Sequence, residues 1–205
     1  MIEGLIEGAI EALYPSRCAA CDRIGAQFWC SVCAVGLERA GPFDIQGIGS
    51  ARAGFVYRGP IVRAIRRWKF AGAWWLARDL ARAIESEARV LRTDAWVPVP
   101  LDSERARTRG FNPSSELARA LGGPVWHGLV RRRATGTQLG RTRVQRLAAD
   151  LGYEGTGRRI DGAQVTVVDD VCTTGATARA VGRVLLKQGA RSVSLLVVAR
   201  SETEP

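Results

Sequence analysis

The pattern of apolar and polar positions divides the chain into a helical start, an irregular stretch and a long region of alternating strands and helices. Residues 2–13 carry apolar side chains on one helical face and glutamates mostly on the other, which predicts an amphipathic helix. Residues 34–50 are rich in glycine, and we interpret them as a linker or an irregular cover. Beyond residue 51, short apolar runs alternate with segments of helical period.

The region from residue 51 onward predicts an α/β fold. Residues 163–168 form an apolar run without alternation, as expected for a strand that is buried on both faces of a parallel sheet. Asn112 followed by Pro113 has the form of a helix N-cap with proline at the first helical position. Strands that alternate with helices indicate a mostly parallel, doubly wound sheet. The expected strands are 53–57, 95–100, 163–168 and 192–199, and the expected helices are 61–69, 76–91, 113–121 and 176–188.

The length of 205 residues suits one medium domain with a small attachment. We therefore divide the chain into residues 1–45, an N-terminal helix with a cysteine module, and residues 51–205, the α/β domain. Glu3, Glu7 and Glu11 stand where a secretory segment carries basic residues, and no apolar run approaches the roughly 18 residues of a membrane span. We expect a soluble, cytoplasmic protein without stable membrane insertion.

The net charge of +10 indicates either an anionic partner or a compositional bias. Of the 30 basic residues 28 are arginine, and only Lys69 and Lys187 are lysine. A bias toward arginine codons explains this ratio without any function. Alternatively, guanidinium groups bind phosphate oxygens in pairs, and both polyphosphate ligands and nucleic acid fit such a charge.

The most informative segment is the loop after the apolar run at 163–168. Thr173, Thr174 and Thr177 offer hydroxyl groups at the expected start of a helix, and Gly175 allows a ligand to approach the backbone closely. A helix start also presents unpaired N–H groups and the positive end of the helix dipole, which suit a phosphate monoester. The predicted phosphate site comprises Thr173, Thr174, Gly175, Ala176 and Thr177.

Asp169 and Asp170 end the same strand, and phosphate binding alone does not explain them. Carboxylates repel phosphate but accept hydrogen bonds from a sugar diol, so the pair suits the 2′- and 3′-hydroxyls of a ribose. The two acids can also stabilise positive charge that develops at the anomeric carbon. An acid pair that only caps the following turn is the structural alternative.

The order of apolar strand, acid pair, Thr-Thr-Gly-Ala-Thr loop and helix resembles the motif with which type I phosphoribosyltransferases bind 5-phosphoribosyl-1-pyrophosphate (PRPP). Thr166 stands where an aliphatic residue is usual, which is a small departure. The resemblance implies a type I phosphoribosyltransferase fold with Asp169 and Asp170 as catalytic acids on the ribose hydroxyls. It also implies that the threonine-rich turn holds the 5′-phosphate and that Mg²⁺ binds with PRPP.

An arginine-rich segment supplies cations for the pyrophosphate. Arg105, Arg107 and Arg109 lie in what we expect to be a loop after the strand at 95–100, and Gly110 frees the backbone there. A solvated face of alternating arginines is the alternative interpretation. Beside a PRPP site, we interpret these three side chains as pyrophosphate ligands.

Residues 131–146 predict a mobile basic loop that runs into a short helix. Type I phosphoribosyltransferases close a flexible hood over the site, which excludes water from the reaction. The resemblance implies that Gln138, Arg141 and Arg143 belong to such a hood. A mobile surface loop and a contact to a nucleic acid backbone are the alternatives.

Four of the five cysteines form two pairs, Cys18 with Cys21 and Cys30 with Cys33, and eight residues separate the pairs. Four thiolates in this arrangement suit a closed, structural tetrahedral zinc site, which stabilises a segment too short for its own core. Two disulfides and an iron–sulfur cluster are the alternatives, and a cytoplasmic location disfavours disulfides.

Four further side chains have plain structural interpretations. We interpret Cys172 as a small apolar filler within the loop. His127 is the only histidine and lies outside every motif, so we interpret it as structural or exposed. Trp74 and Trp75 are interpreted as core or interface residues, although aromatic side chains beside arginines also bind single strands.

The set of motifs along the whole chain resembles the ComF family of phosphoribosyltransferase-like proteins. The motifs are the two cysteine pairs, Trp68–Gly72, the Val-Pro-Val-Pro strand that leads to Arg109–Asn112, Thr137 with Gln138, and the PRPP loop. Pro113 is a departure, because a glutamine commonly follows the asparagine. The resemblance implies an association with natural competence, the uptake of single-stranded DNA.

Two hypotheses of different classes follow. The first is an enzyme, a glycosyltransferase that moves the phosphoribosyl group of PRPP to a nitrogen nucleophile and releases pyrophosphate. The second is a non-catalytic module that binds single-stranded DNA and other DNA-uptake proteins, with PRPP as a regulatory or vestigial ligand.

Overall fold

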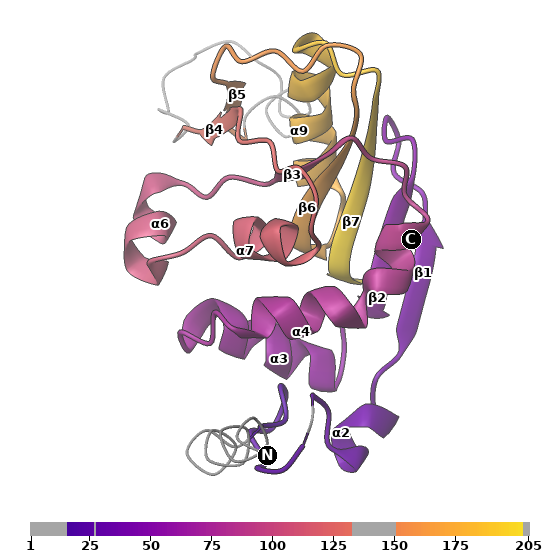
Figure 1. The fold of residues 1–205 in the computed structure, drawn as a ribbon, viewed down its shortest axis with the longest axis vertical. Helices are drawn as coiled ribbons and strands as arrows, with labels where there is room; N and C mark the ends of the chain where they lie inside the picture. The colour runs from indigo at the N-terminus through magenta and orange to yellow at the C-terminus, as the bar shows by residue number, and fades with distance from the viewer. Residues whose placement is uncertain (1–15, 27, 133–150, 203–205) are drawn as a thin grey trace, which may run out of the picture.

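The computed structural model describes residues 16–26, 28–132 and 151–202. Five strands form its central sheet: β1 (Arg39–Phe43), β2 (Ala51–Val56), β3 (Ala95–Pro98), β6 (Gln164–Cys172) and β7 (Ser192–Arg200). Their order is β1-β2-β7-β6-β3 (Figure 1). Only β1 with β2 is antiparallel, and the other neighbouring pairs are parallel. This confirms the predicted α/β fold with a mostly parallel sheet.

Helices cover both faces of the sheet, and side-chain alternation along β7 explains how. Leu196 and Val198 pack with three helices on one face, whereas Leu195 and Val197 pack with a single helix on the other. The three helices are α3 (Pro60–Phe70), α4 (Leu76–Ala83) and α7 (Pro113–Ala120), and the single helix is α9 (Ala176–Lys187).

Helix α3 shows how the amphipathic pattern becomes packing. Ile61, Ile65 and Trp68 recur at helical spacing and are fully buried against the sheet. Complete burial of a side chain of this kind stabilises the fold by about 1.5–3 kcal/mol relative to exposure. The basic residues of the last turn, Arg67 and Lys69, suit the negative end of the helix dipole.

Shorter elements complete the described chain. Two of them, β4 (Leu129–Arg131) and β5 (Tyr153–Gly155), form an antiparallel two-stranded sheet that lies against α9. In Figure 1, α6 (Ser103–Arg109) projects away from the central sheet. The others are α2 (Ser31–Val35) and α5 (Glu85–Arg89).

The interpretation of residues 34–50 as a linker is wrong for part of this stretch, because it contains β1. Gly41 and Pro42 lie within this strand, and both residue types are depleted in strands. Proline is tolerated here because β1 is an edge strand that pairs only with β2. The strand falls inside residues 1–45, so part of that segment joins the central sheet, and the proposed domain boundaries stay a prediction.

The single helix predicted over 76–91 is two helices, α4 and α5, which meet at Ile84. Ile84 leaves the helical conformation, with φ −112° and ψ 11°, and its side chain is fully buried. It packs against Gly54 of β2, where an added Cβ would lie 2.3 Å from Ile84 Cγ2. The chain therefore bends to place a large side chain over a glycine, and no glycine or proline near residue 84 signals this bend.

The predicted loop that carries Arg105, Arg107 and Arg109 is instead the helix α6. The Asp102 carboxylate accepts a hydrogen bond from the N–H of Arg105 at 2.9 Å and so caps the helix start. Gly110 ends the helix in the left-handed conformation, with φ 74°. No residue of α6 is buried, so the segment has no apolar face for a periodicity argument to detect.

The predicted cap of α7 is confirmed, because Asn112 Oδ1 accepts a hydrogen bond from the N–H of Ser114 at 3.0 Å.

Among the residues that the structure describes, no helix is long and apolar enough to cross a membrane.

Thr166 on β6 is fully buried, and its hydroxyl has no hydrogen-bond partner among the described residues. Thr166→Val keeps the shape and removes this unsatisfied group, so we expect the free energy of unfolding to rise by about 1 kcal/mol. Urea denaturation measures this change.

Thr93→Val is the matched control, because the Thr93 hydroxyl donates to the Ala95 carbonyl at 2.9 Å. Loss of that bond is expected to lower the free energy of unfolding by about 1 kcal/mol. Destabilisation by both substitutions would contradict the interpretation of Thr166.

Candidate functional site

The loop between β6 and α9 carries the residues that the sequence predicts for a phosphate site. Gly175 stands at the N-cap of α9 in the left-handed conformation, with φ 71°. Thr174 Oγ1 accepts a hydrogen bond from the N–H of Ala176 at 3.4 Å. Asp169 and residues 173–177 line a small cavity of about 50 Å³ together with buried strand residues. The loop thus brings hydroxyl groups, a helix start and one carboxylate to the same place.

Asp169 is held by two donors. The Ser114 hydroxyl donates to Asp169 Oδ1 at 3.1 Å, and the N–H of Asp170 donates to the same oxygen at 2.9 Å. Burial, followed by the charge of Asp170, raises the pKa of Asp169 to about 7. Asp169 therefore exchanges a proton near neutral pH, which an ordinary aspartate does not.

Asp170 forms an ion pair with Lys69, whose Nζ lies 2.6 Å from Asp170 Oδ1. Both side chains are mostly buried, with 19% of Lys69 and 14% of Asp170 exposed. Lys69 comes from the last turn of α3. In the sequence, Lys69 stands out only as part of a family motif, and its place beside Asp170 is not predicted. Its rarity, as one of two lysines in an arginine-rich chain, was the available signal.

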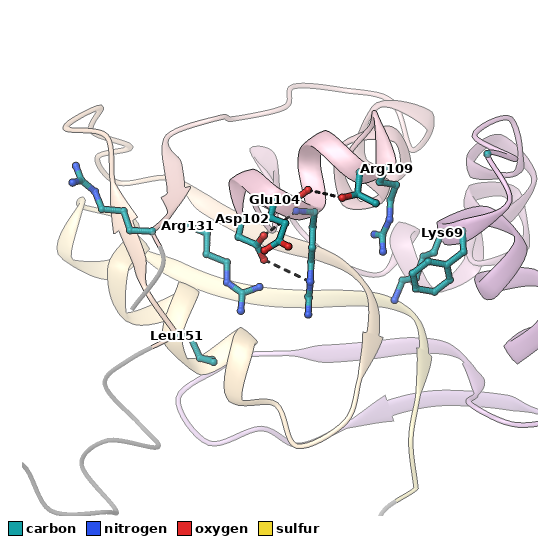
Figure 2. Close-up of a pocket in the computed structure, with 11 residues that line it drawn as sticks. Lys69, Asp102, Glu104, Arg109, Arg131 and Leu151 are labelled. Carbon is teal, nitrogen blue, oxygen red and sulfur yellow. Dashed lines mark hydrogen bonds and ion pairs between the residues drawn. The ribbon is translucent and has the colours of Figure 1, made fainter. Parts of the chain in front are cut away.

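A cavity of about 920 Å³ opens beside this ion pair. Figure 2 shows Lys69 and Arg109 at one end of it and Arg131 toward the other. Five cationic side chains line it against two acidic ones, so its surface is positive overall. The charged lining residues are Lys69, Arg105, Arg109, Arg131, Arg132, Asp102 and Glu104.

The three arginines predicted for pyrophosphate have different positions. Arg109 and Arg105 line the cavity, whereas Arg107 is exposed on α6 and does not. Burial lowers the pKa of Arg109, and the nearby Asp170 carboxylate opposes this effect. The Arg109 guanidinium lies over the Phe70 ring, 5.0 Å from its centroid. Arg109 therefore interacts with the Phe70 ring and with the charge of Asp170.

Tyr153 of β5 is a site residue that no sequence motif indicates. Burial raises its pKa, and a side-chain hydrogen bond with Thr177 of the loop opposes the effect. The Arg131 guanidinium lies 5.2 Å from the centroid of the Tyr153 ring. The two-stranded sheet thus contacts the loop between β6 and α9 through Tyr153 and Thr177. The predicted hood residues, Gln138, Arg141 and Arg143, lie outside the described residues.

The four N-terminal cysteines form one cluster. The Sγ atoms of Cys18, Cys21, Cys30 and Cys33 all lie within 4.8 Å of one another. Tetrahedral Zn–S bonds of about 2.3 Å place sulfur atoms somewhat less than 4 Å apart, and Cys21 Sγ and Cys30 Sγ are separated by 3.7 Å. All five cysteines of the chain are free, and 3.7 Å far exceeds a disulfide bond of about 2.0 Å. The cluster therefore fits a metal ion such as zinc better than two disulfides.

Hydrogen bonds within the cluster lower the pKa of two of its thiols, those of Cys18 and Cys30. Burial tends to raise the pKa of Cys18, but backbone N–H groups, those of Cys30 and Cys21 first, lower it to about 6. Burial raises the pKa of Cys33 to about 12, against a hydrogen bond from Arg63. A bound cation favours the remaining thiolates.

Helix α3 links the cysteine cluster to the loop site. Its Arg63 donates to Cys33 Sγ at 3.8 Å, and its Arg67 donates to the carbonyl oxygens of Cys18 and Ala19 at 2.8 and 3.0 Å. The same helix carries Lys69. Helix α3 therefore contacts the cysteine cluster and also supplies Lys69 to the loop site.

Trp74 and Trp75 are exposed, at 61% and 52%, so they are not core residues, and the alternative that they are interface residues stays a prediction. Their rings form an edge-to-face pair with centroids 6.2 Å apart. Phe70, near them in sequence, is also exposed. In the sequence, these three aromatic residues come shortly after Lys69, at and beyond the C-terminal end of α3.

Two other structural interpretations are confirmed. Cys172 is buried, and burial raises the pKa of its thiol, as expected of an apolar filler. His127 is exposed and lies outside the residues that line the two cavities described above. Partial burial, followed by the charges of Arg119 and Arg158, lowers the pKa of His127.

Residues 107–204 match the family model of the phosphoribosyl transferase domain. This match includes β6, the loop and α9. The protein therefore belongs to the class of proteins that contain a phosphoribosyltransferase domain. Competence protein F of Haemophilus influenzae is 32% identical over 160 residues, which cover 71% of this chain and 70% of that protein. The chain therefore belongs to the ComF family.

Two further curated relatives carry similar names. Competence protein ComFC of Bacillus subtilis is 30% identical over 154 residues, 73% of this chain. The match covers 64% of that protein, so the chain spans less than two thirds of its length. DNA utilization protein YhgH of Salmonella typhimurium is 32% identical over 160 residues, 71% of this chain and 69% of that protein.

Several solved structures align with this chain at low sequence identity. Adenine phosphoribosyltransferase of Saccharomyces cerevisiae aligns with a TM-score of 0.40 at 18% identity over 82% of this chain and 86% of that one. An allosteric regulatory enzyme of purine biosynthesis aligns with a TM-score of 0.41 at 20% identity over 59% of this chain and 25% of that one.

We expect the purified protein to carry about one zinc ion per chain, held by the four cysteines. Cys30→Ser should abolish this zinc content and lower the thermal midpoint of unfolding, because the short segment loses its cross-link. Elemental analysis of the dialysed protein measures the metal.

Cys172→Ser is the matched control, since Cys172 lies outside the cluster, and it should retain the zinc. Equal zinc content in both variants would contradict the assignment, and iron with acid-labile sulfide would identify a cluster instead.

Proposed function

We propose that the chain binds PRPP, with the ribose at Asp169 and Asp170 and the 5′-phosphate on the turn Thr173–Thr177. The observation that carries this proposal is the acid pair beside a helix start with a left-handed glycine at its N-cap. The helix start attracts the phosphate, while the acids accept hydrogen bonds from the sugar hydroxyls. The match of residues 107–204 to the phosphoribosyl transferase domain supports the same ligand.

The pyrophosphate of PRPP fits the positive cavity next to the acid pair. Arg109 and Arg105 line this cavity, and guanidinium groups bind phosphate oxygens in pairs. Arg107 lies outside the lining, so we place the pyrophosphate with the other two arginines. Closure by the hood residues Gln138, Arg141 and Arg143 belongs to this proposal as well.

We further propose that the chain transfers the phosphoribosyl group to a nitrogen nucleophile. The C1′–O bond to pyrophosphate breaks with its electron pair, a nitrogen lone pair forms the new C1′–N bond, and the nitrogen loses a proton. The acid pair stabilises the positive charge at C1′. Asp169, with a pKa of about 7, is suited to proton transfer near neutral pH.

Mg²⁺, which the resemblance implies, does not fit the two acids as they are arranged. The Asp170 carboxylate is paired with Lys69, and one oxygen of Asp169 accepts two hydrogen bonds. A divalent ion in this site would therefore arrive with the pyrophosphate rather than be held by these side chains.

The names of the relatives support a role in DNA uptake. They are competence protein F and DNA utilization protein YhgH. We infer that this chain acts on or beside incoming single-stranded DNA, together with other DNA-uptake proteins. The exposed Trp74 and Trp75 favour a second candidate function, which is direct binding of single strands with PRPP as a regulatory ligand.

Asp170→Asn and Thr174→Val are each expected to weaken PRPP binding by about 10- to 100-fold, as when a hydrogen bond to a charged group is lost. Isothermal titration calorimetry measures the dissociation constants. Asp161→Asn is the control, because Asp161 lies beside Gly189, beyond the opposite end of α9. Unchanged affinity in Asp170→Asn would disprove the site assignment.

The enzyme and the binding module differ in turnover. Incubation with PRPP and a panel of nitrogenous bases should release pyrophosphate if the chain is a transferase. If PRPP binds but no pyrophosphate is released in the presence of any base, the second candidate is favoured.

Double substitution of Trp74 and Trp75 by alanine should weaken binding of a labelled single-stranded oligonucleotide by about tenfold or more, because base stacking contributes about 1–3 kcal/mol per base. Fluorescence anisotropy at several salt concentrations measures the affinity. Its salt slope should stay unchanged, since the phosphate contacts remain. Leu186→Ala, at an exposed apolar position on α9, is the control, and equal affinities would rule out stacking.

A further inference from the structure

The ion pair between Lys69 and Asp170 lies where the sugar acids meet the positive cavity. Lys69 lines the cavity of about 920 Å³, and its Nζ is 2.6 Å from Asp170 Oδ1. Arg109 lines the same end of this cavity (Figure 2). An ammonium group here is within reach of both a ribose acid and any pyrophosphate that Arg109 binds.

A lysine is costly to place in such a position. Removing an ammonium group from water costs several kcal/mol, and a partner carboxylate offsets this only in good geometry. The pair is mostly buried, so solvent screens it weakly. Lysine is also rare in this chain, where 28 of the 30 basic residues are arginine.

The charges around the pair favour a cationic role for Lys69. Asp170 is near two cations, because its charge acts on both Lys69 and Arg109. Five cationic side chains line the adjoining cavity against two acidic ones, and burial raises the pKa of Asp169, which disfavours a second negative charge beside Asp170. The site therefore holds more positive than negative charge before any ligand or metal arrives, which is the condition that a pyrophosphate group requires.

We propose that Lys69 is a tethered cation that bridges Asp170 and the pyrophosphate of PRPP, so that PRPP binding in this chain depends only weakly on a divalent metal ion. The proposal rests on PRPP as the ligand of the site. In the free protein, Lys69 neutralises Asp170. In the complex, its three N–H donors are shared between Asp170 and phosphate oxygens. Lys69 thus provides the charge neutralisation that Mg²⁺ otherwise provides.

The test compares dissociation constants for the sodium salt of PRPP with and without Mg²⁺. Isothermal titration calorimetry uses the full chain in metal-depleted buffer without a chelator, since a chelator competes for the cysteine cluster. For the unsubstituted protein, we expect the dissociation constant for PRPP to change by less than about fivefold when Mg²⁺ is removed. Without Mg²⁺, Lys69→Met should bind PRPP about tenfold or more weakly than the unsubstituted protein. Addition of Mg²⁺ should restore most of this affinity.

Lys69→Arg keeps the charge and should keep the weak metal dependence. If Lys69 only supported the fold, Lys69→Met would weaken binding equally with and without Mg²⁺, and this outcome overturns the proposal. Binding by the unsubstituted protein only with Mg²⁺ also overturns it, while leaving the PRPP site intact. If Lys69→Met lacks a cooperative thermal transition, the test rests on the Mg²⁺ dependence of PRPP binding by the unsubstituted protein and by Lys69→Arg.

A failure of the proposed function has a different signature. The unsubstituted protein then shows no PRPP binding in either buffer, although its zinc content and thermal transition are normal. That result removes the ligand and with it the bridging role of Lys69.

Discussion

The packing of helix α3 on the central sheet is the contact on which the arrangement of this protein depends. Ile61, Ile65 and Trp68 are fully buried against the sheet, so the helix has one position and one rotation. Its polar residues then point in fixed directions. Arg63 contacts the cysteine cluster, and Lys69 reaches Asp170 at the carboxyl end of β6. The cysteine cluster and the candidate ligand site thus share helix α3 as a common support.

The site itself separates two kinds of charge over a short distance. Acids at the end of β6 suit a sugar, and cations on α3 and α6 suit phosphate groups. Each would be unfavourable alone, because buried carboxylates repel one another and clustered cations do the same. Together they form a surface with a negative and a positive part, complementary to a phosphorylated sugar with a charged leaving group.

Local signals explain which parts could be predicted from the sequence. The cap at Asn112 and the loop after β6 depend on residues adjacent in the chain, so short-range rules apply. β1 escaped prediction because an edge strand with glycine and proline lacks the usual pattern. Helix α6 escaped because none of its residues is buried. The pairing of Lys69 with Asp170 joins distant segments, and only the folded chain brings them together.

The place of β1 at the sheet edge has a consequence for the behaviour of the protein in concentrated solution. An open strand edge invites pairing with another molecule and so promotes aggregation. β1 is five residues long and contains Pro42, which has no N–H to donate. On the other side, Trp96 of β3 forms a bridge with Val125. Both margins of the sheet are thereby protected from intermolecular strand pairing, and β6, which carries Asp169 and Asp170, is paired on both sides, with β7 and with β3.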